Sequence, residues 1–424
     1  MRIRFFHVKI LTMEKGRPIF DGELWVENER ILYVGEGKAS TEGIAFDRQI
    51  DGRGNLLMPG FKNAHTHSGM TLLRSLADDL PLFDWLNQQV FPVEEKLTEE
   101  DIYYLTKLAV LEYVTSGITA IFDMYLTPET IAQAVTECGL RCVQVGAVNN
   151  FSQSVKMMEE MYKKLNHLGP LSTYILGFHG EYTCKKGLLE DIAALAHQYK
   201  APIFSHNSET LFEVEECKKR YGKTPTAFLD SLGMFDYGGG GYHCVYMTEE
   251  DICIFKERAL SVVTNPSSNL KLASGIAPIK DFLREGINVA IGTDGPASNN
   301  CLDMFREMFL VTGLAKFREK DASAVDADQV LSMATLGGAK AMHIRESDVL
   351  AKGKLADMIM LDLHRPNMQP INNISKNIVY SGSKENVKMT MVHGKILYEK
   401  GEFFVGMDPE EIYRKVNDIK ERIV

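Results

Sequence analysis

Apolar and polar residues alternate along the first part of the chain, a pattern typical of strands with one buried face. Residues 3–11 alternate in this way, and residues 23–28 and 30–35 repeat the pattern on either side of a short break. Near the other end, residues 354–362 form an apolar run, and residues 387–398 have a hairpin pattern. We therefore expect both chain ends to join in one small β-sandwich domain.

The pattern changes at Asn55, after which short apolar strands alternate with longer helical stretches such as residues 99–113. Parallel strands need crossover helices, so eight strand–helix alternations predict an α/β fold, a (β/α)8 TIM-type barrel. The eight predicted strands cover residues 56–64, 118–123, 141–148, 174–179, 202–206, 241–245, 260–264 and 287–294.

These patterns divide the chain into two domains. The barrel is expected over residues 58–345, and the small β-domain over residues 1–57 and 346–424. Residues 409–424 are predicted to form a C-terminal amphipathic helix, because Ile412 and later apolar residues recur at helical spacing.

Composition narrows the possible partners. The chain has 47 basic and 57 acidic residues, a net charge of −10, which argues against nucleic acid and fits a small-molecule substrate. No apolar run approaches the roughly 18 residues of a membrane span. Seven cysteines without a Cys-x-x-Cys pair, and an N-terminus without a secretion signal, lead us to expect a cytoplasmic protein. A homo-oligomer stays open.

Histidines gather at the ends of the predicted barrel strands. His65 and His67 are two residues apart in the first strand and therefore point to the same side. Taken alone, this pair fits surface or core histidines equally well. However, His179, His206 and His243 also lie at the ends of predicted strands. Because barrel active sites form at the carboxyl ends of strands, these five imidazoles are expected to face one mouth.

Asp294 closes the eighth predicted strand and adds a carboxylate to this set. Histidines with a carboxylate suit a divalent transition-metal ion, above all zinc or iron, which lowers the pKa of a bound water. Asp294 can contact both the ion and the water. Glu209, three residues after His206, is placed to carry a proton to the substrate, and His243 to polarise the reacting centre.

Three stretches resemble a known family: residues 63–67 with 70–74, residues 265–272 and residues 292–300. On these motifs the chain resembles the amidohydrolase superfamily, and within it the aminohydrolases that deaminate heteroaromatic rings. The resemblance extends over residues 57–303 and is weaker on both sides.

The resemblance implies a reaction and a role for each matching residue. It implies hydrolytic deamination of a purine-like amine, such as the adenosine derivatives 5-methylthioadenosine and S-adenosylhomocysteine, giving the inosine analogue and ammonia. It also implies one divalent ion, Zn²⁺ or alternatively Fe²⁺. The implied metal ligands are His65, His67, His206 and Asp294; Glu209, His243 and Asp294 act in catalysis; and Glu94, His179, Glu209 and Asp294 contact the substrate, Glu94 through the ribose hydroxyls.

One departure concerns the substrate pocket. Adenosine-type members of the family have an arginine in or just after the third strand, where this chain has Gly146. Phe83 and Trp85 are candidates for lining the pocket, although they fit simple packing of the following helix equally well. Two other functions remain open: deamination or dechlorination of another ring, such as guanine, a pterin or a triazine, and a scaffold without catalysis.

Overall fold

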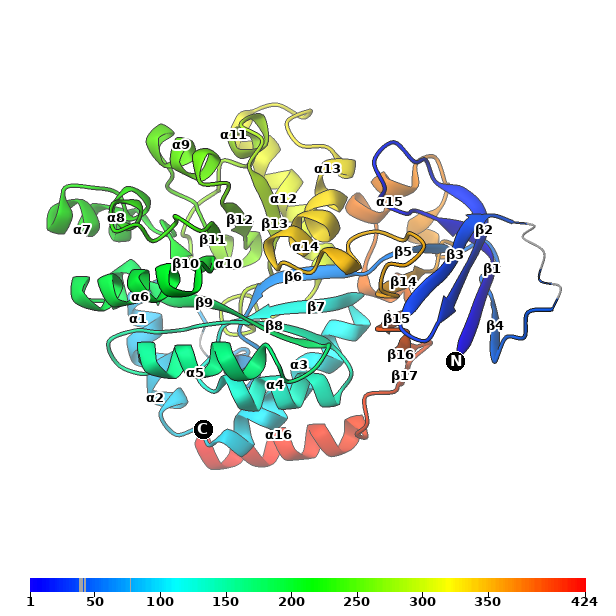
Figure 1. Cartoon of the computed structure of the whole chain (residues 1–424), viewed down its shortest axis with the longest axis horizontal. Helices are drawn as coiled ribbons and strands as arrows, with labels where there is room; N and C mark the ends of the chain where they lie inside the picture. The colour runs from blue at the N-terminus through cyan, green and yellow to red at the C-terminus, as the bar shows by residue number, and fades with distance from the viewer. Residues whose placement is uncertain (38–40, 42, 77) are drawn as a thin grey trace.

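The computed structural model describes residues 1–37, 41, 43–76 and 78–424, and it contains a barrel beside a sheet built from both chain ends (Figure 1). The predicted fold class is confirmed. The barrel strands are parallel and follow each other in sequence order around the barrel. They are β6 (Phe61–Thr66), β7 (Ile118–Asp123), β8 (Arg141–Val145), β9 (Ser172–Gly180), β10 (Ile203–Asn207), β11 (Gly239–His243), β12 (Ser261–Thr264) and β13 (Asn288–Ile291).

Hydrogen bonds join the last strand to the first. The N–H of Asp294 donates to the carbonyl oxygen of His65 at 2.9 Å, and the N–H of Thr293 donates to the Asn63 side chain at 2.8 Å. These contacts bring the segment after β13 against β6, so residues from the two ends of the barrel sequence share one site.

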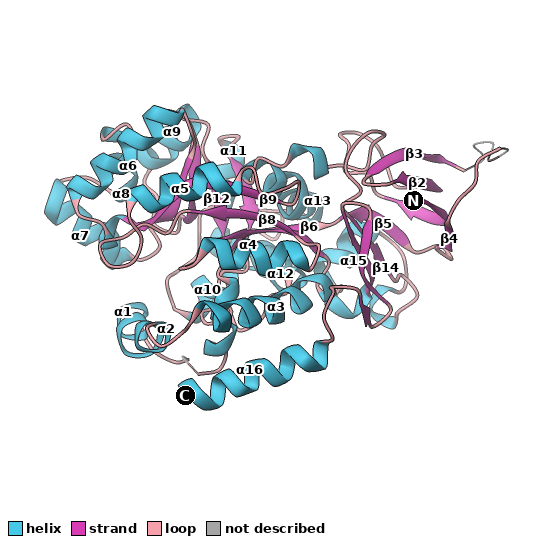
Figure 2. Ribbon diagram, turned by 60° about the horizontal axis from the view of Figure 1, so that its bottom comes forward, coloured by secondary structure: helices cyan, strands magenta, loops and turns pink. Residues whose placement is uncertain are grey.

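Helices surround the barrel strands (Figure 2). Several short helices lie in the loops that follow the strands. After β6 come η1 (Ser68–Leu73), α1 (Leu82–Trp85), η2 (Leu86–Val90) and α2 (Phe91–Glu94). The other helices up to residue 380 are α3 (Glu99–Thr115), α4 (Pro128–Glu137), α5 (Val155–Leu165), η3 (Glu181–Thr183), α6 (Lys186–Tyr199), α7 (Leu211–Tyr221), α8 (Pro225–Ser231), α9 (Glu249–Glu257), α10 (Pro266–Lys271), α11 (Ile279–Arg284), α12 (Met304–Glu319), α13 (Ala327–Ser332), η4 (Met333–Gly337), α14 (Gly338–Ala341), η5 (Arg345–Ser347), η6 (Pro366–Met368) and α15 (Ile374–Tyr380). Among the described helices, none is long and apolar enough to cross a membrane.

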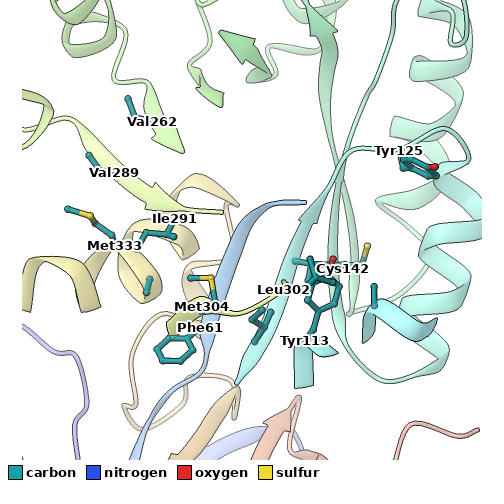
Figure 3. Close-up of a cluster of buried hydrophobic side chains, with 14 of the residues drawn as sticks. Phe61, Tyr113, Tyr125, Cys142, Val262, Val289, Ile291, Leu302, Met304 and Met333 are labelled. Carbon is teal, nitrogen blue, oxygen red and sulfur yellow. The ribbon is translucent and has the colours of Figure 1, made fainter. Parts of the chain in front are cut away.

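The barrel strands are buried on both faces. In β7, Ala120 and Phe122 belong to the cluster inside the barrel, whereas Ile121 packs in the layer under the helices. Figure 3 shows part of this outer layer, where Val289 and Met333 are drawn with other buried side chains. Burial on both faces explains why the barrel strands appear in the sequence as continuous apolar runs.

The strands of the terminal sheet form one hydrogen-bonded path. Its order is β17-β16-β15-β14-β5-β1-β2-β3, with β4 paired to β1. Its strands are β1 (Arg2–Ile10), β2 (Phe20–Glu27), β3 (Arg30–Glu36), β4 (Arg48–Asp51), β5 (Leu56–Pro59), β14 (Met358–Leu361), β15 (Val387–Val392), β16 (Lys395–Glu399) and β17 (Glu402–Phe403), with η7 (Lys384–Asn386) before β15. The predicted hairpin at residues 387–398 is therefore present.

The prediction of one strand over residues 56–64 is wrong in one respect: the segment forms two strands, β5 and β6. β5 pairs with β1 and β14 in the terminal sheet, while β6 belongs to the barrel. Gly60 separates them, and a Cβ atom there would lie 2.0 Å from Cγ2 of Thr119. The chain thus passes from one sheet to the other at a residue without a side chain.

The C-terminal helix α16 (Pro409–Ile423) packs against the barrel helix α3 (Figure 2). Ile419 and Ile423 belong to one buried apolar cluster with Leu105 of α3, and Arg422 pairs with Asp101 at 2.5 Å. The helix therefore lies along the barrel rather than on the terminal sheet. The domain limits at residues 57/58 and 345/346 stay a prediction.

Buried charges lie where the barrel meets the terminal sheet. Arg141 of β8 pairs with Asp357 at 2.8 Å, and the N–H of His393 donates to the same carboxylate at 2.7 Å. Lys62 of β6 is also fully buried and donates to Gly60 and Thr119, and burial lowers its pKa to about 8. Asp357 thus balances two buried cations.

We predict that Asp357→Asn lowers the apparent free energy of unfolding by about 3–5 kcal/mol, because it leaves the Arg141 guanidinium buried without a counter-charge. Urea unfolding followed by circular dichroism measures this change. Asp230→Asn is the matched control, since Asp230 pairs with the partly exposed Arg258, and it is expected to cost less than about 1 kcal/mol. Equal small losses in both variants would contradict the prediction.

Candidate metal centre and active site

His65 lies at the centre of a cluster of imidazoles at the carboxyl ends of the barrel strands. Its side chain has no exposure, and neither of its ring nitrogens has a hydrogen-bond partner. The rings of His67 and His206 lie with their centroids 4.7 and 5.0 Å from that of His65. A buried polar nitrogen without a partner is costly, and a bound ion would supply the missing interaction.

The potential ligand atoms form two overlapping groups. In one, His65, His67 and Asp294 offer atoms within 4.8 Å of one another, and in the other His65, His206 and His243 do so. Nε2 of His67 is 3.1 Å from Oδ1 of Asp294, and Nε2 of His65 is 3.6 Å from the same oxygen. The structure therefore brings together all four residues expected as ligands, with His243 beside them.

Backbone carbonyls orient two of the imidazoles. Nδ1 of His67 lies 2.5 Å from the carbonyl oxygen of Met124, and Nδ1 of His206 lies 2.5 Å from that of His179. A carbonyl oxygen only accepts, so each ring donates through Nδ1. In the neutral ring this leaves the Nε2 lone pair directed at the cluster, as in metal-binding histidines.

Asp294 lies three residues beyond the end of β13, although the sequence pattern placed it within the strand. Its backbone φ is +59°, and its carboxylate accepts hydrogen bonds from the hydroxyls of Ser268 at 2.6 Å and Ser298 at 2.9 Å. The N–H of Gly295 donates to the other oxygen at 2.7 Å. These donors fix the carboxylate in an unusual local conformation.

The pKa values follow from burial and from Asp294. Burial, with the neighbouring histidines, holds the pKa of His65 and His206 well below its ordinary value, so both rings are neutral. Burial also opposes the charge of His67, yet Asp294 raises its pKa to about 9. Burial alone would raise the pKa of Asp294. The hydrogen bond and the charge of His67, with the neighbouring histidines, outweigh this effect and hold the pKa of Asp294 well below its ordinary value. The neutral rings of His65 and His206 and the ionised carboxylate of Asp294 suit a divalent cation, which would take the place of the proton on His67.

Glu209 and His243 lie on one side of the cluster. Oε2 of Glu209 is 3.8 Å from Nε2 of His243, and Nδ1 of His243 is 2.7 Å from the side-chain oxygen of Asn269. The hydroxyl of Ser274 donates to Glu209 at 3.2 Å. Burial is the main cause that raises the pKa of Glu209, which favours its protonated form.

Glu213 fixes the backbone that carries Glu209. Its carboxylate accepts the N–H of Ser208 at 2.9 Å and that of Glu209 at 2.8 Å. Burial raises the pKa of Glu213 to about 7. The sequence interpretation missed this residue, and its only signal was its position four residues after Glu209. It also assigned no role to Asn269, Ser268 or Ser298, although all three lie in the family-like stretches.

A cavity of about 460 Å³ opens over the cluster. His67, His179, His206, Glu209, His243 and Asp294 line one part of it, so it contains most of the residues expected in the site. Trp85, Leu86 and Glu94 from the segment after β6 line another part. The side chain of Phe83 lies outside the described residues. A volume of this order suits a small ring compound.

Glu94 and His179 both face the cavity. Oε1 of Glu94 is buried and has no hydrogen-bond partner, and burial raises the pKa of Glu94 to about 7. Nδ1 of His179 lies 3.1 Å from the Thr183 hydroxyl, and burial lowers its pKa to about 4. The cavity thus offers a carboxylate oxygen and a neutral imidazole to a ligand.

Gly146 does not belong to the described lining of the cavity, contrary to the interpretation from sequence. A Cβ atom there would lie 2.6 Å from the carbonyl oxygen of Gly177 and 2.8 Å from Sδ of Met158. The position therefore faces packed backbone and helix α5. Ala147 and Asn149 are the residues of this segment that reach the cavity.

Comparisons with known proteins agree with the fold and the site. Residues 56–397 match the model of the amidohydrolase family. A 5-methylthioadenosine/S-adenosylhomocysteine deaminase of Caldanaerobacter subterraneus subsp. tengcongensis is 39% identical over 100% of this chain and 99% of its own length. An adenosine deaminase from Xanthomonas campestris with bound zinc superposes with a TM-score of 0.94 and 32% identity, covering 100% of this chain and 98% of that one.

An atrazine chlorohydrolase from Arthrobacter aurescens, complexed with zinc, has a TM-score of 0.90. It is 21% identical and covers 99% of this chain and 100% of its own, so it supports the fold alone. Sequence, barrel and clustered histidines lead to one conclusion: the chain belongs to the amidohydrolase family.

Proposed function

We propose that this protein is a metal-dependent aminohydrolase that deaminates the adenine ring of 5-methylthioadenosine or a related adenosine derivative, releasing ammonia. The observation that carries the proposal is the position of Glu209, whose buried carboxyl lines the cavity and lies 3.8 Å from Nε2 of His243 in the histidine cluster. The names of the relatives support the same reaction, because they are 5-methylthioadenosine/S-adenosylhomocysteine and adenosine deaminases.

The residues present fit a divalent ion. Both ring nitrogens of His65 are buried without a hydrogen-bond partner. His67 and His206 use Nδ1 to bind backbone carbonyls, which leaves their Nε2 atoms free to bind the ion. We assign these three imidazoles and Asp294 as ligands and zinc as the native ion. When bound there, such an ion would lower the pKa of a coordinated water toward neutrality.

The chain's own groups would move the protons. Glu209, with its raised pKa, is suited to donate a proton to the ring nitrogen beside the attacked carbon. Asp294 stays ionised and is suited to accept a proton from the attacking water. His243, held by Asn269, would hydrogen-bond the oxygen that becomes bonded to the ring. The proton taken by Asp294 would then pass to the ring amine, so that the carbon–nitrogen bond breaks and ammonia leaves, while the second proton of the water restores the carboxyl of Glu209.

We assign Glu94 to the ribose hydroxyls and His179 to the substrate ring. The buried Oε1 of Glu94 lacks a partner, and a ribose hydroxyl would supply the missing donor. We also propose that the protein acts in the cytoplasm on small molecules rather than on nucleic acid. Its seven free cysteines and net charge of −10 support this assignment.

The direct test is a substrate panel on zinc-loaded protein, with metal content measured on the same sample. We expect the ultraviolet absorbance of 5-methylthioadenosine and adenosine to shift as the amine is lost, and a chelator to abolish the change. No turnover of amino-purines, pterins or pyrimidines would reject the proposal. Release of chloride from a chlorinated triazine, without release of ammonia from adenosine derivatives, would favour the chlorohydrolase alternative.

Glu209→Gln is expected to lower kcat by about 10²–10⁴-fold, because it removes the proton donor while keeping the size of the side chain. Steady-state kinetics with 5-methylthioadenosine measures the loss, and metal content should remain unchanged. Glu190→Gln is the matched control, since Glu190 is exposed on α6 and pairs with Lys186. A Glu209 variant as active as this control would remove Glu209 from the mechanism.

Glu94→Gln is expected to raise KM for nucleosides by about 10- to 100-fold, the effect of losing one hydrogen bond to a charged acceptor. Because the pKa of Glu94 is raised to about 7, KM of the unsubstituted enzyme should rise as the pH falls below 7. This pH dependence should disappear in the variant. Unchanged KM in both measurements would mean that Glu94 does not bind the ribose.

A further inference from the structure

Acidic side chains and histidines line the cavity over the histidine cluster. Glu94, Glu95, Glu209 and Asp294 are among its lining residues. Among all the described residues that line it, none is a lysine or an arginine. A substituent that points away from the cluster therefore meets acidic, uncharged polar and apolar side chains, but no lysine or arginine of the described lining.

The two lysines that directly adjoin lining residues in the sequence are held by other parts of the protein. Lys96 follows Glu95 in sequence, and its Nζ donates to the carbonyl oxygen of Ile423 at 3.1 Å. Lys271 precedes the lining residue Leu272. Its Nζ donates to the Asn300 side chain at 2.5 Å and to the carbonyl oxygen of Ala297 at 3.1 Å, and it also pairs with Asp78. Using either lysine to bind a ligand would break these contacts.

Apolar side chains form the open end of the cavity. Phe91 and Phe151 line it and are 38% and 86% exposed, which places them at its mouth. Leu82 and Leu126 also belong to the lining. A substituent that extends from the cluster toward solvent therefore passes apolar surface, which favours thioether and alkyl groups.

An anionic substituent would lose hydration in this cavity without gaining a lysine or arginine as its partner. The acidic side chain of Glu95, which is exposed and belongs to the lining, would also repel it. We propose that the cavity selects adenosine derivatives whose 5′ substituent is neutral or cationic and discriminates against those that carry a carboxylate or a phosphate there. This inference rests on the proposed deamination and specifies its substrate class.

The two thioether nucleosides in the relatives' names differ in the charge of the 5′ substituent. The methylthio group of 5-methylthioadenosine is uncharged, whereas the homocysteine tail of S-adenosylhomocysteine carries a carboxylate and an ammonium. A 3-aminopropylthio analogue has a tail of similar length with the ammonium but without the carboxylate. Comparing the three separates the effect of the carboxylate from that of length and of positive charge.

The experiment measures kcat/KM for these three nucleosides and for adenosine 5′-monophosphate with the zinc-loaded enzyme. We expect 5-methylthioadenosine and the aminopropylthio analogue to differ little. S-adenosylhomocysteine and the monophosphate should be about 10- to 100-fold poorer, the effect of one charged group left without its partner. Values for S-adenosylhomocysteine equal to those for 5-methylthioadenosine would overturn the inference while leaving deamination intact. If no nucleoside is deaminated, the proposed function fails and the inference fails with it.

A cationic residue added at the mouth of the cavity tests whether the missing positive charge causes the substrate preference. Phe151→Arg places a guanidinium on an exposed lining position and should improve S-adenosylhomocysteine relative to 5-methylthioadenosine by about two- to fivefold, as expected for an exposed ion pair. Phe151→Gln is the neutral control and should leave the ratio unchanged. An equal change of the ratio in both variants, or no change with arginine, would show that charge does not set the preference.

Discussion

The active site depends on how the protein accommodates a fully buried imidazole, that of His65. Both ring nitrogens of His65 are buried without a hydrogen-bond partner, and its ring stacks on Tyr242 with centroids 3.8 Å apart. Burial and neighbouring histidines hold its pKa well below the ordinary value, so the ring cannot meet the cost of burial by taking up a proton. Metal coordination is the interaction that satisfies a neutral imidazole in such a place.

The surrounding structure fixes the groups that would share this ion. His67 and His206 are oriented by backbone carbonyls, and Asp294 by two serine hydroxyls and a backbone N–H. Strand β6 carries His65. The buried Lys62 of this strand donates a hydrogen bond to Thr119 of β7, and Gly60, which precedes β6, packs closely against the same threonine. The junction with the terminal sheet therefore supports the site without contributing a group to it.

Much of the fold could be predicted from the sequence, because hydrophobic periodicity and strand–helix alternation are local properties. The barrel, the terminal hairpin and the C-terminal helix all follow from such patterns. The division of residues 56–64 into two strands could not, because it depends on which partner strands lie on each side of Gly60. The packing of α16 on α3 likewise depends on contacts between distant segments, such as Arg422 with Asp101.

The site shows the same limit. Histidines at strand ends could be found by counting, since parallel strands bring their carboxyl ends to one mouth. The direction in which a residue near a strand end points was less predictable. A Cβ atom at Gly146 would point at Met158 of helix α5 and not into the cavity. Residues such as Glu213 and Asn269 act through hydrogen bonds to other site residues, and only a three-dimensional arrangement reveals these contacts.

One divalent ion bound by His65, His67, His206 and Asp294 would explain how the four side chains are arranged. A crystal structure of the zinc-loaded protein, with anomalous data collected at the zinc edge, tests it most directly. We expect one strong peak about 2.0–2.2 Å from a nitrogen of each of the three histidines and from a carboxylate oxygen of Asp294. The absence of a peak, or a peak held by His243 in place of His67 and Asp294, would contradict it.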